Sequence, residues 1–85
     1  MAILNTPPIS YATLTVATCN VLNLALPGRD FYPGQEPFNQ SEYERKVNWL
    51  GERIQTLNAD VLAVQEVWDE AALQEAVKRS GLRYA

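Results

Sequence analysis

Apolar positions along the chain fall into segments with two different periods. Residues 13–22, "TLTVATCNVL", and 60–67, "DVLAVQEV", are short, rich in β-branched residues and almost without a polar face, which predicts strands covered on both sides. Residues 42–57 and about 70–79 instead repeat apolar side chains at spacings of three and four, which predicts amphipathic helices. "LRYA" at 82–85 predicts the start of a third strand.

The first predicted helix has recognisable ends. Ser41 and Glu44 form an S-x-x-E capping box before it, and Asn58-Ala59-Asp60 ends it. Its predicted buried stripe is Tyr43, Val47, Leu50, Ile54 and Leu57. Its predicted solvated face is Glu42, Arg45, Glu52 and Arg53.

The second predicted helix begins after Asp69, a residue type that caps helices, and ends at Gly81. Its predicted buried stripe is Ala72, Leu73, Ala76 and Val77.

Two segments have no regular period. Residues 1–12 predict an extended leader, because Pro7 and Pro8 withhold backbone donors. Residues 25–40, "ALPGRDFYPGQEPFNQ", contain three prolines and predict a loop longer than most connections. That loop is either a tolerated surface insertion or a functional loop, and the functional interpretation rests on Arg29, Phe31 and Tyr32 near the end of the strand.

Composition limits the classes of function. The chain has 85 residues, which predicts one small domain, and its net charge of −3 argues against gripping a nucleic-acid backbone unaided. Cys19 is the single cysteine and the chain has no histidine, so Cys19 is interpreted as a small core residue in a reducing compartment, not as a nucleophile. The sequence contains neither an apolar run long enough for a membrane span nor a signal-peptide pattern, which predicts a cytoplasmic protein.

Polar residues stand where the two predicted strands end. A helical crossover makes the strands parallel, so Asn20, Asn23 and Glu66 should gather at one edge of the sheet, where open α/β sheets bind ligands. Because side chains alternate along a strand, the two asparagines point to opposite faces unless a bulge intervenes. One of them can then face Glu66, and the other is expected to cap the following turn.

Glu66 is the most informative of these residues. A carboxylate at the end of a buried strand must be paired or must coordinate a cation to stay ionised. Carboxylate and amide oxygens suit a hard ion such as Mg²⁺, but Arg, Lys or solvent could also satisfy Glu66. The residue pattern leaves these alternatives open.

Two stretches together resemble a known family. "LTVATCNVLNL" and "EYERKVNWLGERIQTLNADVLAVQEVWD" are similar to the first part of the endonuclease/exonuclease/phosphatase superfamily, whose members include DNase I-like nucleases, inositol polyphosphate phosphatases and sphingomyelinases. The resemblance covers most of the chain. It implies that residues 1–85 form the N-terminal β-α-β-α part of a DNase I-like four-layered α/β sandwich, incomplete in this chain.

The resemblance also implies site residues and a reaction. Glu66 matches the family's Mg²⁺-binding glutamate, with Mn²⁺ as a possible substitute, and Asn20 matches the strand-end asparagine near the metal and the scissile phosphate. Asn20 is therefore expected to be a catalytic and metal-site residue. Arg29 is expected to bind substrate for a separate reason, because its loop leaves the strand directly after Asn20 and its positive charge suits a phosphate. Gln65 matches the family's "QE" pair without an assigned role, and no role is carried onto Asn23. The implied activity is Mg²⁺-dependent hydrolysis of phosphate esters, as a phosphodiesterase, nuclease or phosphatase.

Part of the family's machinery is missing from this sequence. Family members use a later Asp-x-Asn segment and a late Ser-Asp-His segment, whereas this chain has no histidine. We therefore expect an N-terminal fragment that is inactive alone and that associates with the rest of its domain or with itself through exposed sheet edges. The alternative is a small non-catalytic α/β interaction module that binds a partner through those edges.

Overall fold

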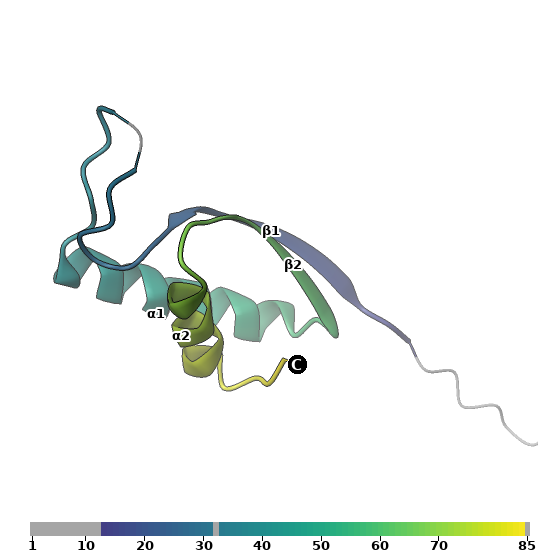
Figure 1. The fold of residues 1–85 in the computed structure, drawn as a ribbon. Helices are drawn as coiled ribbons and strands as arrows, with labels where there is room; N and C mark the ends of the chain where they lie inside the picture. The colour runs from purple at the N-terminus through teal and green to yellow at the C-terminus, as the bar shows by residue number, and fades with distance from the viewer. Residues whose placement is uncertain (1–12, 32, 85) are drawn as a thin grey trace, which may run out of the picture.

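The part of the chain that the structure describes has an α/β fold with two strands and two helices in alternation. The computed structural model describes residues 13–31 and 33–84, so the predicted leader at 1–12 lies outside the described residues. Strand β1 (Val16–Leu24) precedes helix α1 (Gln40–Leu57), and strand β2 (Val61–Val67) precedes helix α2 (Glu70–Ser80) (Figure 1). β1 and β2 pair in parallel, which confirms the predicted crossover.

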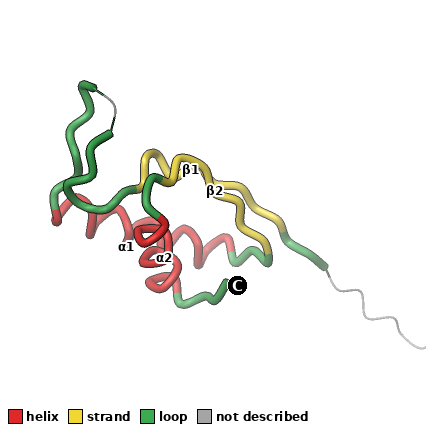
Figure 2. Tube along the Cα trace, viewed as in Figure 1, coloured by secondary structure: helices red, strands yellow, loops and turns green. Residues whose placement is uncertain are grey.

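Both helices lie on one face of the two-stranded sheet (Figures 1 and 2). Side chains along β1 consequently alternate in exposure, and Val16 and Leu22 on the other face are 59% and 64% exposed. The prediction of strands covered on both sides is therefore wrong for the described residues. The strands are apolar as predicted, but the two helices cover only one face of the sheet.

The core forms where β1 and the two helices meet. It consists of Val21, Leu24, Tyr43, Val47, Leu50, Ile54, Ala72 and Ala76. Four of the five residues in the predicted stripe of α1 are buried, but Leu57, in the last turn, is 43% exposed. In α2, Ala72 and Ala76 are buried as predicted, whereas Leu73 and Val77 are only partly buried. The four predicted solvent-facing charged residues of α1 are all exposed.

The helix caps differ in part from the prediction. α1 begins two residues earlier than expected, because the capping box joins Asn39 and Glu42 instead of Ser41 and Glu44. Asn39 Oδ1 accepts a hydrogen bond from Glu42 N at 2.8 Å, and Glu42 Oε1 accepts one from Asn39 N at 3.0 Å. Asn39-x-x-Glu42 and Ser41-x-x-Glu44 both match the capping-box pattern. The box forms at Asn39 because the loop ends there, and the first backbone N–H groups of the helix need acceptors. The helices end as expected, at left-handed Asn58 and Gly81.

The predicted third strand does not form within residues 82–84, which follow α2 without strand geometry. Tyr84 instead turns back toward the start of β2, and its hydroxyl donates to the carbonyl of Ala59 at 2.7 Å. The segment therefore packs beside β2 and does not pair with it. None of the helices in the described part of the chain is long and apolar enough to cross a membrane.

Candidate functional site

The two strands leave regular geometry at the same level, near their carboxyl ends. The register is regular from Val16 opposite Val61 to Asn20 opposite Gln65, and it then shifts before Leu24 meets Val67. Leu22 and Asn23 on β1 and Glu66 on β2 all have left-handed φ angles, of 55°, 60° and 62°. Such conformations cost on the order of 1–3 kcal/mol each in residues other than glycine, and they cluster at functional sites. The strand ends are therefore the strained part of the sheet.

The two asparagines are used in different ways at this bulge. Asn20 is exposed, and its Oδ1 accepts a hydrogen bond from Leu22 N at 2.9 Å, so Asn20 is the one that caps the following turn. Asn23 Oδ1 accepts a hydrogen bond from the indole Nε1 of Trp68 at 3.1 Å. A bulge does intervene in the strand between Asn20 and Leu24, where the register shifts.

Glu66 lies next to the pairing of Asn20 with Gln65, so the structure brings Glu66 and Asn20 to the same level of neighbouring strands. Its side chain is exposed, and it takes part in none of the ion pairs that the described residues form. Glu66 is therefore not the buried charge that the sequence predicted, because water can solvate its exposed carboxylate. The left-handed backbone at Glu66, in an exposed strand residue, is the feature that still needs a reason.

Lys46 of α1 reaches this end of the sheet. Its Nζ donates to the carbonyl oxygen of Leu22 at 2.6 Å and lies 5.3 Å from the centre of the Phe38 ring. Burial lowers the pKa of the Lys46 ammonium from its ordinary value, and the negative charge of Glu66 opposes part of that shift. Lys46 is therefore within electrostatic range of Glu66 while it is hydrogen-bonded to the bulge.

The loop at 25–40 is tied to the start of α2. Arg29 forms an ion pair with Asp69 at 3.5 Å, and its guanidinium lies 5.8 Å from the centre of the Trp68 ring. Phe31 packs edge-on against Trp68 at 5.2 Å and against Phe38 at 5.6 Å. Asp69 stands at the N-cap of α2 as predicted, but its carboxylate accepts from Leu26 N at 3.0 Å and makes no cap hydrogen bond within the helix. The base of the loop is thus packed, whatever its function.

Arg29, the predicted substrate-binding residue, keeps a side chain that is 47% exposed despite these contacts. An exposed ion pair of this kind is worth about 1 kcal/mol or less, so a phosphate could compete with Asp69 for the guanidinium.

The oxygen atoms at the strand ends would suit a largely hydrated divalent cation. Mg²⁺ usually takes one or two carboxylates and keeps several waters, and the Glu66 carboxylate is open to solvent. The side-chain oxygen Oδ1 of Asn20 retains a second lone pair beyond the one that accepts the hydrogen bond from Leu22 N. Residues 13–31 and 33–84 contain no group of three or more acidic, cysteine or histidine side chains that could hold a metal ion. These residues could therefore contribute part of a Mg²⁺ or Mn²⁺ site, and not a closed cage.

Neither Lys46 nor Trp68 is among the site residues predicted from the sequence. A signal for Lys46 exists, because it lies three residues after Tyr43 and four before Leu50, on the flank of the buried stripe of α1. The contact of Trp68 with Asn23 depends on the bulge, which no spacing rule locates.

Comparison with known proteins identifies no relative of this chain. No protein-family model, curated protein or solved structure matches the chain. The functional proposal consequently rests on the residues at the strand ends and on the resemblance described from the sequence.

Proposed function

We propose that the chain is the N-terminal part of a Mg²⁺-dependent phosphoesterase, a hydrolase of the endonuclease/exonuclease/phosphatase type. One observation carries the proposal: two parallel strands end together in left-handed turns that hold Asn20 and an exposed Glu66 at one edge of the sheet. In open α/β sheets this edge is the usual ligand site. A strained backbone at an exposed glutamate in that position is better explained by ligand binding than by a requirement of folding.

Glu66 and Asn20 would contribute oxygen atoms to the cation in this proposal. When bound, Mg²⁺ supplies a Lewis acid that polarises a phosphoryl oxygen and steadies a leaving group. Arg29 would orient the phosphate ester through its exposed guanidinium, at the base of the packed loop. The chain has no histidine to serve as a base for water, so the remainder of the same domain would supply one.

The proposal is tested with Glu66→Gln in the complete protein, which keeps the side chain's shape and removes its charge. Hydrolysis of a generic phosphodiester and of a phosphomonoester should fall by orders of magnitude, with an unchanged melting temperature. Glu52→Gln is the matched control, because Glu52 is an exposed glutamate of α1 far along the chain from the strand ends. Near-normal turnover in Glu66→Gln would overturn the assignment.

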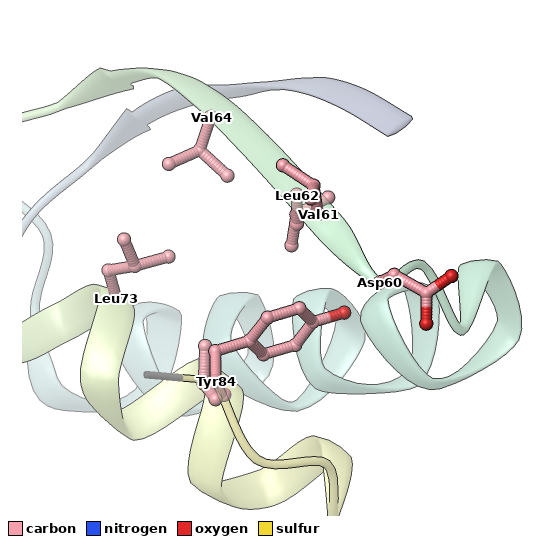
Figure 3. Close-up of a pocket in the computed structure, with 7 residues that line it drawn as sticks. Asp60, Val61, Leu62, Val64, Leu73 and Tyr84 are labelled. Atoms are coloured by element: carbon pink, nitrogen blue, oxygen red, sulfur yellow. The ribbon is translucent and has the colours of Figure 1, made fainter. Parts of the chain in front are cut away.

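The alternative is a non-catalytic interaction module, and exposed apolar surface favours it. Leu14, Val16 and Leu22 are between 59% and 70% exposed. An open cavity of about 370 Å³ also lies between β2, α2 and Tyr84. In Figure 3, Leu62 and Val64 of β2 face Leu73 and the Tyr84 ring across this cavity.

These surfaces support the partners that we propose: the rest of the same domain, or a second copy that adds to a sheet edge. A pure interaction module would bind no divalent cation, so titration of the complete protein with Mn²⁺ separates the two functions. Cys19, which is free and partly buried, is consistent with the reducing cytoplasmic location that we include in the proposal.

A further inference from the structure

Leu22 is held at both of its backbone polar groups by side chains. Its N–H donates to Asn20 Oδ1 at 2.9 Å, and its carbonyl accepts from Lys46 Nζ at 2.6 Å. Its own side chain is 64% exposed and gives the bend little anchorage in the core. Val21 and Leu24 on either side of the bend are buried in the core, so packing fixes the flanks of the bend while these two polar contacts hold Leu22 itself.

Lys46 is well placed to hold this bend rigidly. It projects from α1 next to Val47, which is fully buried, so its backbone is part of the best-packed helix. The ring of Phe38 lies against its ammonium at 5.3 Å, and the flexible side chain is thereby confined. A lysine that is confined in this way acts as a fixed donor and not as a mobile surface charge.

We propose that Lys46 is a positioning residue, which fixes the left-handed bend of β1 and with it the side-chain amide of Asn20, at the edge of the sheet where Glu66 of β2 also lies. The role of the bend in cation binding rests on the proposed function. The contact between Lys46 and the bend does not.

Two physical effects of Lys46 on a cation site have opposite signs. As a positive charge within range of Glu66, Lys46 repels a divalent cation, so its removal should tighten binding. As a support for the oxygen ligands, its removal should weaken binding. The direction of the change therefore identifies which effect dominates.

The experiment compares Lys46→Met, Lys46→Arg and Arg45→Met with the wild-type protein. Methionine keeps an apolar stem against Phe38 and removes the donor, whereas arginine keeps a charged donor. Arg45 is the matched control, because it is an exposed cation on the adjacent position of α1. Amide hydrogen exchange is followed by mass spectrometry at Leu22, and Mn²⁺ binding is followed by electron paramagnetic resonance.

We expect exchange at Leu22 to accelerate on the order of tenfold in Lys46→Met and to stay near wild type in Lys46→Arg and Arg45→Met. Mn²⁺ affinity should fall about tenfold in Lys46→Met, although a positive charge has been removed. Unchanged exchange at Leu22, faster exchange spread evenly over all amides, or tighter Mn²⁺ binding in Lys46→Met would overturn the proposal. A wild-type protein that binds no Mn²⁺ would count against the proposed function, and exchange at Leu22 would still decide the role of Lys46.

Discussion

Replacement of Glu66 by glycine should separate the stability of the strand end from its function. Glu66 has a φ of 62° and an exposed side chain, so glycine relieves backbone strain and removes little packing. A left-handed residue other than glycine costs about 1–2 kcal/mol, and glycine brings an entropic penalty of about 0.5–1 kcal/mol. The difference predicts that Glu66→Gly stabilises the fold by about 0–1.5 kcal/mol.

The measurement is urea unfolding of the complete protein and of three variants of it, with the midpoint and slope fitted together. Glu66→Gln keeps the left-handed strain and should lie within about 0.5 kcal/mol of the wild type. Gln65→Gly is the matched control, because Gln65 is exposed, neighbours Glu66 and has no left-handed φ. It should be destabilised by about 0.5–1 kcal/mol.

Both Glu66 variants should lose affinity for Mn²⁺, while Gln65→Gly should retain it. If Glu66→Gly were destabilised as much as Gln65→Gly, the left-handed backbone would not be a source of strain. Mn²⁺ binding that survives in both Glu66 variants would remove this residue from the metal site.

Three further predictions concern the loop, the contact between the helices and the chain by itself. Arg29→Ala should raise KM for a phosphate ester in the complete protein, and unchanged KM and kcat would make residues 25–40 a surface insertion. The hydrogen bond from Arg79 at 2.6 Å lowers the pKa of Glu44 below its ordinary value, so the stability that this pair contributes is present above about pH 4.5 and is lost as pH falls through the lowered pKa. The melting temperature of Glu44→Gln should therefore fall less steeply in acid than that of the wild type. An identical dependence of the two melting temperatures on acidic pH would disprove the contribution of Glu44. The 85-residue chain alone should associate during sedimentation and hydrolyse no phosphodiester, whereas a compact monomer with Mg²⁺-dependent activity would contradict both expectations.

The sequence by itself determined β1, α1, β2 and α2 and their connection, although not the strand predicted at 82–85. Apolar spacing in α1 located Tyr43, Val47, Leu50 and Ile54 in the core, because a helix that packs on one side must repeat its buried positions every three to four residues. A helix between two apolar strands also determined the parallel pairing, since the helix returns the chain to the end of the sheet where the first strand began. These features depend on local periodicity, which a sequence displays directly.

Only the tertiary structure decided the geometry of the strand ends. The exposure of Glu66 could not be predicted from its apolar neighbours in the sequence, because exposure depends on which face of the sheet the helices cover. The left-handed turn at Leu22 and Asn23 and its contact with Lys46 join residues of two elements, and no spacing rule encodes that contact. Tyr84 likewise does not form the predicted strand, and its hydroxyl instead donates a hydrogen bond to the carbonyl of Ala59, 25 residues earlier. Such contacts are set by packing between elements, which is where the candidate site lies.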